Sequence, residues 1–419
     1  MPIDPNPVRQ QFPSLNRPAI FLDNPAGTQI ARQSLDRINH YLLECNANHE
    51  GMFETSRRSD EILHEAHAAM ADFLNASRAE EIIFGNNMTT LTLHISRSLS
   101  RSLQPGDNIL VTRLDHDANI SPWMLAAEDK GCNLLWVDID VEEGTLDLED
   151  FERALEKKPK IAAFGYASNL LGTVNPVRKL TRKAKEAGAL VYIDAVQYAP
   201  HGPIDVQDID CDFLVCSSYK FFGPHAGALY GKYELLNELK AYKVRPASDE
   251  LPYKFETGTQ NHEGIAGVLG ALEYFEWLGQ EFGSDLAQPW QQAGFTGRRL
   301  LYKQAMTAIR NYEYELSRAL IGAIESVPGT RVHGVTDPDR LDERVPTVSF
   351  TLDGRDPEKI ADAIGKQGAY VWNGHNYALA IVERMGLLEA GGMVRVGPVH
   401  YNTLEEIERF REILLDVAG

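Results

Sequence analysis

Lys220 and Asp194 are the two residues whose types and placement suggest a shared reaction. Lys220 ends the run 215–220 and begins a turn that contains glycine and proline, and Asp194 ends the apolar run 189–193. A lysine amine in such a turn can hold an aldehyde as a Schiff base, and a carboxylate can keep a pyridine nitrogen protonated so that the ring withdraws electrons. The pair therefore predicts a pyridoxal phosphate (PLP) site and chemistry at the Cα carbon of an amino acid.

Short apolar runs alternate with helical patterns through the first part of the chain. Runs rich in branched residues predict strands at 82–84, 108–111, 134–137, 161–164, 190–193 and 213–215. Helical patterns flank or separate them, as at 59–75 and 177–187. This alternation predicts parallel strands joined by crossover helices, which is an α/β fold. Ligands of such sheets bind at the carboxyl ends of the strands, and Asp194 falls at one of those ends.

The chain beyond residue 287 predicts a second, smaller unit. A helical pattern runs from about 288 to 323 with little interruption. The segments 344–350, 357–367, 369–372, 393–396 and 404–417 then predict the order β-α-β-β-α. We therefore predict a large PLP-binding domain over 21–287, followed by a long connecting helix and a small α+β domain over 288–419. Residues 1–20 are expected to form an N-terminal arm that packs on the small domain.

Composition narrows the class of protein. The chain has 419 residues, is 43% hydrophobic and carries a formal charge of −19, which favours a folded enzyme and argues against nucleic acid or an anionic membrane as a partner. The first residues lack the basic and apolar parts of a secretory signal, and no apolar run is long enough to span a membrane. The four cysteines have no zinc-like or redox spacing, so we predict reduced thiols, no metal site and a cytoplasmic location.

Several motifs, in a fixed order, resemble the class V aminotransferases, which are fold type I PLP enzymes. Residues 21–29 are similar to the family's YLDNAATTQ, 114–123 to MEHHANIVPW, 168–176 to SNVLGTENP, 194–197 to DGAQ and 217–220 to SGHK. The likeness runs from about residue 21 to residue 410 and is to the branch of cysteine desulfurases and selenocysteine lyases. The resemblance implies a three-layer α/β/α large domain with a mainly parallel seven-stranded sheet, a small α+β C-terminal domain and a homodimer.

The resemblance assigns a role around the cofactor to each matched residue. Lys220 would hold the cofactor and then move the Cα proton, Asp194 would contact the pyridine nitrogen, and His116 would stack on the ring and relay protons. The expected hydrogen-bonding residues are Gln197 and Asn169 at the phenolic oxygen, Met88, Thr89, Ser217 and Tyr219 at the phosphate, and Thr259 at the phosphate of the other subunit. Met88 can offer only its backbone N–H where the family has threonine, and Tyr219 stands where the desulfurases have histidine.

The substrate end departs from the family. Arg395 aligns with the arginine that binds the substrate α-carboxylate, which a guanidinium can hold through two parallel hydrogen bonds. Tyr377 stands where a desulfurase has its nucleophilic cysteine, and a phenol cannot accept sulfur as a persulfide. Trp372 replaces a basic residue, so the pocket is expected to be more apolar and less cationic. His375 and Tyr377 are candidate acid–base groups for the substrate side chain, or they simply pack around the mouth of the site.

These residues support carboxylate binding and removal of the Cα proton, and that step leads to several reactions. Elimination of a β-substituent, through cleavage of a carbon–sulfur or similar bond and without a persulfide cysteine, is the leading interpretation. Transamination by a class V aminotransferase and epimerisation by an isopenicillin-N-epimerase-like enzyme remain alternatives. A further alternative is a scaffold that keeps the PLP fold and has lost its chemistry, although Lys220, Asp194, His116 and Arg395 are all present.

Overall fold

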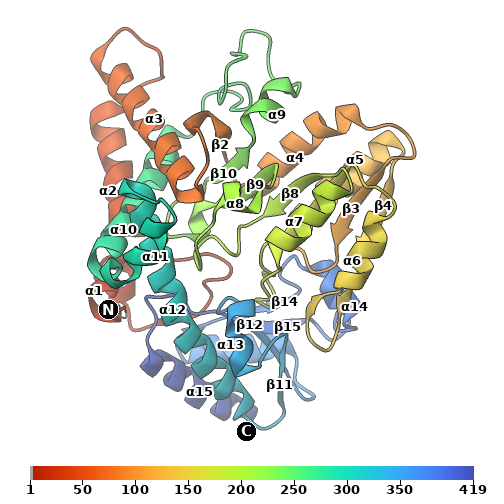
Figure 1. The fold of residues 1–419 in the computed structure, drawn as a ribbon. Helices are drawn as coiled ribbons and strands as arrows, with labels where there is room; N and C mark the ends of the chain where they lie inside the picture. The colour runs from red at the N-terminus through yellow and green to blue at the C-terminus, as the bar shows by residue number, and fades with distance from the viewer. Residues whose placement is uncertain (1–2) are drawn as a thin grey trace.

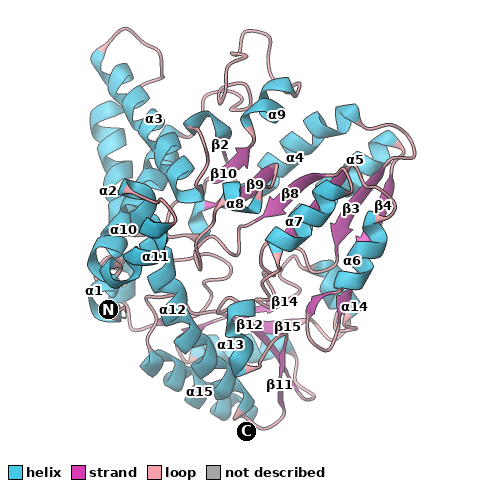
Figure 2. Cartoon of the chain, in the orientation of Figure 1, coloured by secondary structure: helices cyan, strands magenta, loops and turns pink. Residues whose placement is uncertain are grey.

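A central sheet of seven strands forms the large part of the molecule (Figure 1, Figure 2). In this computed structural model, which describes residues 3–419, the strand order is β2-β10-β9-β8-β7-β3-β4. The strands are β2 (Ile82–Gly85), β3 (Asn108–Thr112), β4 (Asn133–Val137), β7 (Ile161–Gly165), β8 (Leu190–Asp194), β9 (Phe213–Ser217) and β10 (Gly227–Gly231). Every neighbouring pair is parallel except for the two pairs made by β10. The predicted α/β fold with a mainly parallel seven-stranded sheet is confirmed.

Alternate residues of each strand enter two different hydrophobic cores, and helices therefore cover both faces of the sheet. Val191 and Ile193 of β8 lie in one core, whereas Tyr192 lies in the other. The first core includes residues of α3 (Glu54–Leu74), α7 (Val177–Glu186) and α10 (His262–Phe282), and the second includes residues of α4 (Met88–Leu99) and α5 (Ser121–Lys130). A parallel strand buried on both faces needs a continuous apolar run, which is the pattern that predicted these strands.

A second, antiparallel sheet lies toward the C-terminus, at the bottom of Figure 1. Its strand order is β11-β12-β15-β14, with β11 (Thr330–His333), β12 (Val348–Leu352), β14 (Trp372–Gly374) and β15 (Met393–Val396). The helices α13 (Pro357–Lys366) and α15 (Leu404–Ala418) follow β12 and β15 as predicted. The expected strand at 369–372 is divided, because β13 (Ala369–Tyr370) leaves this sheet and pairs with β1 (Ile20–Phe21).

The helix expected over 288–323 is interrupted, which corrects the sequence prediction. It consists of α11 (Ala287–Gln292) and α12 (Gly297–Glu325). Gly294 lies between them with φ of +90°, a left-handed conformation that ends a helix and that glycine adopts without steric cost. The long connecting helix is therefore α12, which runs from the side of the large sheet to the small sheet (Figure 1).

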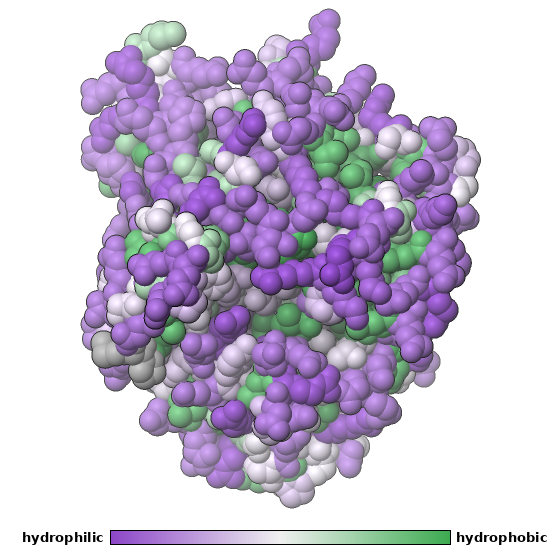
Figure 3. Space-filling view, in the orientation of Figure 1, coloured by the Kyte–Doolittle hydropathy of each residue, from purple (hydrophilic) through white to green (hydrophobic). Residues whose placement is uncertain are grey.

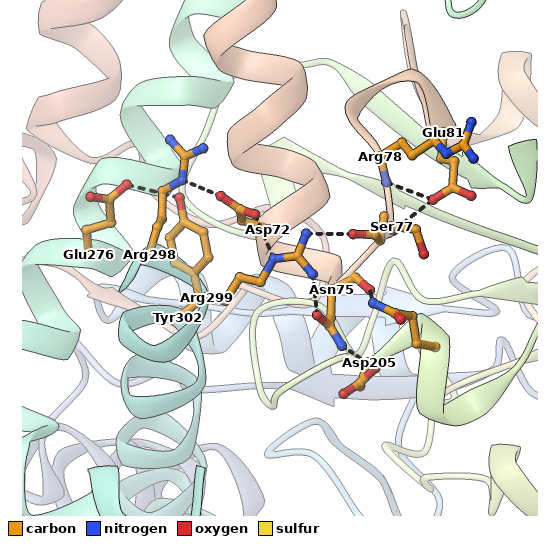
Figure 4. A network of polar contacts seen from close by, with 12 residues as sticks. Asp72, Asn75, Ser77, Arg78, Glu81, Asp205, Glu276, Arg298, Arg299 and Tyr302 are labelled. Atoms are coloured by element: carbon orange, nitrogen blue, oxygen red, sulfur yellow. Dashed lines mark hydrogen bonds and ion pairs between the residues drawn. The ribbon is translucent and has the colours of Figure 1, made fainter. Parts of the chain in front are cut away.

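The first turn of α12 is joined to the end of α3 by polar side chains (Figure 4). Arg298 Nε and Arg299 Nε donate to the two carboxylate oxygens of Asp72, each at 2.8 Å. Arg299 also donates to Asn75 Oδ1 at 2.6 Å, and Asn75 Nδ2 donates to Asp205 Oδ1 at 2.8 Å. We call these five residues the α3–α12 network. It fixes one end of α12 to the part of the molecule that carries the central sheet.

The N-terminal arm contacts the C-terminal unit. Arg9 Nη1 donates to the carbonyl oxygen of Tyr401 and to Glu406, each at 2.9 Å. The parallel pairing of β1 with β13 adds a backbone link between the same two parts. Residues 1 and 2 of the expected arm lie outside the described residues. The domain boundaries at 20/21 and 287/288 stay a prediction.

The surface seen in Figure 3 is mostly hydrophilic, and hydrophobic residues show there as small separate patches. This agrees with a chain that has 60 acidic and 41 basic residues. In the part of the chain that the structure describes, no helix combines the length and the apolar character needed to cross a membrane.

Candidate active site

Two adjoining cavities lie at the carboxyl ends of the central strands. The first, which we call the inner slot, is lined by Gly165, Asp194 and Ser217 at the ends of β7, β8 and β9. The second, which we call the outer chamber, has a volume of about 810 Å³ and is lined in part by the segment 372–377. Lys220 and His116 line both cavities. The structure therefore brings the two residues that suggested a shared reaction, Lys220 and Asp194, into one slot.

The turn that carries Lys220 is held by residues from the start of the chain. Thr28 donates to the carbonyl oxygen of Tyr219 through its backbone N at 3.0 Å and its hydroxyl at 3.2 Å. The Lys220 amine donates to the carbonyl oxygen of Pro25. Burial, followed by the charge of Arg395, lowers the pKa of Lys220 to about 7. An amine with this pKa is partly neutral near pH 7 and can attack a carbonyl carbon.

Asp194 is one of two buried carboxyl groups in the inner slot. Its Oδ1 accepts a hydrogen bond from Val196 N at 2.9 Å, and burial raises its pKa to about 6 against the opposing charge of Lys220. Asp115 lines the same slot, accepts from Gly165 N, and has a pKa raised well above its usual range by burial and by the charge of Asp194. Two close buried carboxyls do not both ionise readily, so Asp194 carries the charge at neutral pH. It can balance a cationic ring nitrogen.

His116 separates the inner slot from the outer chamber. Its Nδ1 accepts a hydrogen bond from Ala118 N at 3.0 Å, so the proton of the neutral ring sits on Nε2. Burial, with the charges of Lys220 and Arg395, lowers the pKa of His116 to about 3, and the ring is neutral at physiological pH. Tyr377 stacks on this ring, with centroids 5.5 Å apart and planes 14° apart. Tyr377 lines only the outer chamber, so of these two rings only His116 also lines the inner slot.

The start of α4 closes one end of the inner slot. The Asn87 side chain caps the helix by accepting from Thr90 N at 2.9 Å, and Met88 N donates to Ser217 Oγ at 3.0 Å. Thr89 lines the slot beside them. A helix N-terminus with hydroxyl groups around it suits a phosphate. The Met88 N–H, which the sequence analysis offered to phosphate, is donated to Ser217 in this structure.

Gly227 lets β10 approach the cap of α4 closely. A methyl group at Gly227 would lie 2.5 Å from the carbonyl carbon of Asn87, and that contact would push the cap away from Ser217.

Two amide side chains enter the inner slot and tie it to the C-terminal unit. Gln197 Nε2 donates to the hydroxyl of Thr347 at 2.8 Å, and Asn169 Nδ2 donates to the carbonyl oxygen of Asn376 at 2.8 Å. Their buried oxygens, Gln197 Oε1 and Asn169 Oδ1, have no hydrogen-bond partner among the described residues. Each amide nitrogen keeps a second N–H for a ligand. The sequence analysis predicted that both amides lie at the cofactor. It did not predict their hydrogen-bond partners, Thr347 and the Asn376 carbonyl.

Arg395 projects from β15 and is 4% exposed. Its Nη1 donates to the carbonyl oxygen of Asn169 at 2.8 Å, while its Nε is buried without a partner in the described chain. Burial lowers the pKa of Arg395 to about 10, and the charge of Asp23 opposes this shift, so the guanidinium is charged at neutral pH. A buried cation with unused donors suits a carboxylate ligand.

Asp23 lies close to Arg395 and Lys220 without lining either cavity, and the sequence analysis gave it no role. Burial raises its pKa, and the nearby charges of Arg395 and Lys220 oppose the shift. Its Oδ1 is buried and has no hydrogen-bond partner within residues 3–419. The available signal was its place in the motif 21–29, which matched the family but carried no assigned role.

The segment 372–377 forms the outer wall of the outer chamber. Trp372, His375 and Tyr377 all line it, and Trp372 and Tyr377 expose 50% and 69% of their surfaces. The Tyr377 carbonyl accepts from Asp117 N at 2.7 Å, which fastens the segment to the opposite wall. Within residues 3–419 none of the four cysteines lines either cavity, and all but Cys132 are buried.

Thr259 is not brought into either cavity. It lines a separate surface pocket with Asn86 and Gln260, and Leu93 lines both this pocket and the outer chamber. A residue meant for the other subunit should lie outside its own site, as Thr259 does. Its contact with a second subunit stays a prediction.

The inner slot fits PLP. An aldehyde, a ring nitrogen and a phosphate call for an amine, a carboxylate and a helix N-terminus, and the slot presents Lys220, Asp194 and the start of α4. The unpartnered oxygens of Asn169 and Gln197 are a further sign that a ligand belongs there, because buried polar atoms of folded proteins normally have partners.

Comparisons with known proteins agree with this geometry. The family model of the class V aminotransferases matches residues 20–293 and 296–410. A cysteine desulfurase of Synechococcus elongatus is 33% identical over 424 residues, covering 97% of this chain but only 62% of that protein. An aminotransferase-like protein of Gibberella zeae is 33% identical over 411 residues, covering 96% of this chain and 95% of that protein. An apo cysteine desulfurase structure from Thermococcus onnurineus NA1 has a TM-score of 0.87 at 26% identity, covering 100% of this chain and 99% of that one.

Proposed function

Because the chain belongs to the class V aminotransferase family of PLP-dependent enzymes, we propose that it is a cysteine desulfurase-like lyase that works without a persulfide cysteine. It would eliminate a β-substituent, by cleavage of a carbon–sulfur or similar bond, from an amino acid. One observation carries the proposal: Tyr377 occupies the chamber wall, and within the described chain no cysteine lines either cavity. Transfer of sulfur to the protein therefore has no acceptor at the site.

When PLP is bound, its protonated ring withdraws electrons from the Cα carbon of the amino acid. Asp194 keeps the ring nitrogen protonated, because its buried carboxylate gains a cation as a partner. Arg395 holds the substrate α-carboxylate through the donors that the protein leaves unused. Lys220, whose pKa of about 7 leaves it partly neutral, takes the proton from Cα.

The leaving group develops negative charge, and His116 can donate a hydrogen bond to it. Its neutral ring carries the proton on Nε2, because Nδ1 is occupied by the Ala118 amide. The pKa of about 3 keeps the ring neutral, so the proton that the leaving group takes up comes from Lys220, which has received it from Cα, or from solvent. Stacking by Tyr377 fixes the plane of the imidazole and so the direction of the Nε2–H hydrogen bond.

Transamination is the second candidate, and the Gibberella relative favours it. That protein carries an aminotransferase-like name and is similar along 96% of this chain. Transamination uses the same Lys220, Asp194 and Arg395. It differs from elimination in the fate of the intermediate, because the proton taken from Cα is returned to a different atom and the β-substituent is kept. The site residues alone therefore do not separate the two reactions.

Product analysis separates them. The PLP-loaded protein is incubated with candidate amino acids in heavy water. Pyruvate with sulfide or a thiol supports elimination, whereas a spectrum of the pyridoxamine form with a keto acid supports transamination and contradicts our proposal. Deuterium at Cα without another product would indicate epimerisation. A protein that stays colourless with PLP, or whose chromophore survives borohydride, would indicate a scaffold without chemistry.

We also propose that the active unit is a homodimer in which Thr259 serves the partner's phosphate site. The support is its position outside both cavities of its own chain and beside the outer chamber at Leu93. Mixing Lys220→Ala and Thr259→Ala chains tests this. In a mixed dimer one site carries both lesions and the other carries neither, so activity should exceed that of either variant alone. If mixing gives only the average, Thr259 acts within its own chain or not at all.

A further inference from the structure

The outer chamber, which also takes in the carboxylate-binding Arg395 and the reacting Lys220, has more room than the side chain of cysteine requires. Its volume of about 810 Å³ lies within the range of pockets that hold drug-sized ligands. Cysteine carries a single sulfur atom beyond Cβ. A substrate that filled the chamber would have a much larger substituent at the same carbon.

The sheet register places Trp372 beside the carboxylate-binding arginine. Trp372 of β14 pairs directly with Arg395 of β15 in the antiparallel ladder. Directly opposed residues point to the same face of a sheet, and their Cβ atoms lie roughly 5 Å apart. Both side chains line the outer chamber. An amino acid held by Arg395 therefore has the Trp372 indole next to it.

Tyr377 is held in place by its backbone. Asn376 and Tyr377 have φ of +49° and +58°, a left-handed conformation that costs non-glycine residues about 1–2 kcal/mol each. Hydrogen bonds fix this turn: Asn169 donates to the Asn376 carbonyl at 2.8 Å, Asp117 N to the Tyr377 carbonyl at 2.7 Å, and Tyr377 N to His375 Nδ1 at 3.1 Å. The ring is thus presented to the chamber as a fixed wall, even though 69% of the residue is exposed.

The chamber offers a negatively charged side chain neutral donors such as Ser121 and Asn373, but no uncommitted cation among the described lining residues. Of the described residues that line it, the only lysine and arginine are Lys220 and Arg395, which are committed to the reacting carbon and the α-carboxylate. The only carboxylate is Asp117, which would repel an anion. Leu93 and Pro122 add apolar surface to the two aromatic rings.

From these observations we infer that the substrate is a cysteine with an uncharged, bulky and preferably aromatic substituent on sulfur. Trp372 and Tyr377 would select it by covering the substituent, in the way that flat rings pack against one another. This inference rests on the proposed elimination. It adds the substrate class and assigns the selectivity to two residues that replace polar groups of the desulfurase pattern.

The reaction balances without any thiol on the protein. The Cα–H bond breaks and its proton passes to Lys220, while the Cβ–S bond breaks with both electrons staying on sulfur. The thiolate takes a proton and leaves as a thiol. Addition of one water to the three-carbon remainder yields pyruvate and ammonium. An aryl or alkyl thiolate departs without a protein nucleophile, which agrees with the absence of cysteine from the lining residues that the structure describes.

The test compares four substrates on the PLP-loaded protein: S-benzylcysteine, S-isobutylcysteine, S-carboxymethylcysteine and cysteine. The isobutyl and carboxymethyl groups have the same shape and differ in charge. We expect kcat/KM for S-benzylcysteine to exceed that for cysteine by roughly 10- to 100-fold, the usual gain from burying an aromatic group. We expect S-isobutylcysteine to exceed S-carboxymethylcysteine by about tenfold or more.

Four substitutions locate the selectivity. Trp372→Ala and Tyr377→Ala should each remove most of the preference for S-benzylcysteine, and Tyr377→Phe should keep it because the ring remains. Trp372→Arg should reverse the order of the isobutyl and carboxymethyl substrates. Tyr370→Ala is the matched control, since this exposed aromatic residue lies two positions earlier and does not line the chamber.

Titrating the PLP-loaded protein with each substrate and following the cofactor spectrum measures binding without turnover. This measurement tests the substrate class separately from the proposed reaction. If no substrate yields pyruvate but S-benzylcysteine binds about tenfold more tightly than cysteine, and Trp372→Ala removes the difference, the substrate class stands and the elimination fails. If cysteine is bound and turned over as well as S-benzylcysteine, the inference is overturned, whichever product forms.

Discussion

Two of the places where polar side chains meet in this molecule satisfy them in opposite ways. In the α3–α12 network, Arg299 uses its donors on Asp72, Asn75 and a backbone carbonyl (Figure 4). Around the inner slot, by contrast, Asn169 Oδ1, Gln197 Oε1 and Arg395 Nε are buried and have no partner within residues 3–419.

The difference separates polar groups that stabilise the fold from polar groups that are available to bind a ligand. Burying an unpartnered polar atom costs about 1–3 kcal/mol, so a cluster of such atoms is retained only where another benefit offsets the cost. In the network the polar groups complete one another. At the cavities they stay incomplete, beside a lysine whose pKa is lowered by burial. Substitutions in the two regions should therefore affect different properties.

The largest expected effect is that of Lys220→Ala. Turnover should fall by roughly 10⁴-fold or more, because the substitution removes both the cofactor link and the base. Stability of the cofactor-free protein should fall by no more than about 1 kcal/mol, since the folded state loses an amine whose burial is unfavourable. Steady-state kinetics and urea unfolding check the two parts. A variant that keeps even one hundredth of its turnover would remove Lys220 from the centre of the site.

Arg395→Ala should have the next largest effect. KM for the amino acid should rise by about 100-fold, because the α-carboxylate loses its charged partner, while the spectrum of the bound cofactor stays the same. Arg395→Lys should recover only part of the loss, because an ammonium cannot form the paired contact. An unchanged KM in Arg395→Ala would place carboxylate binding elsewhere.

Arg299→Ala tests the other side of the comparison. The free energy of unfolding should fall by about 1–3 kcal/mol, because Asp72 and Asn75 lose a partner in a partly exposed position. Turnover per folded molecule should be unaffected. Arg318→Ala, on an exposed face of the same helix, is the matched control and should change neither the free energy of unfolding nor turnover. A loss of turnover without a loss of stability would mean that the network belongs to the function.

The smallest effect concerns pH. Only the neutral amine of Lys220 attacks the aldehyde, and with a pKa of about 7 its neutral fraction rises from about one tenth at pH 6 to nine tenths at pH 8. The rate at which cofactor-free protein takes up PLP should therefore rise roughly tenfold over this range and then level off. Pyridoxine 5'-phosphate, which lacks the aldehyde, is the control and should not follow this profile. A flat profile for PLP would contradict the lowered pKa.

Most of the fold could be predicted because its strands are buried on both faces. Continuous branched runs such as 190–193 are typical of strands buried on both faces of a parallel sheet. β10 was missed because its residues, Gly227–Gly231, begin and end with glycine, include no β-branched residue and follow closely after the lysine turn. The interruption at Gly294 was missed although Gly294 and Gly297 are helix-breaking signals in the sequence, and the backbone angle of Gly294 shows the break directly.

The candidate site could be predicted only as far as its motifs extend. Motifs placed Asp194, Ser217 and Lys220, and the slot brings these three together. The stack of Tyr377 on His116 joins positions far apart in the sequence, and no local pattern encodes it. The roles of these residues at a bound cofactor stay predictions.

The placement of the cysteines has a consequence for the environments in which the protein can work. Three of the four thiols are buried, and burial also raises the pKa of the partly exposed Cys132. Peroxide and alkylating reagents attack accessible thiolates, whereas three of these thiols are buried and the fourth, Cys132, has a raised pKa. We expect the enzymatic activity to persist after treatment with hydrogen peroxide or iodoacetamide at concentrations that inactivate thiol-dependent enzymes. Such a catalyst could continue through oxidative stress.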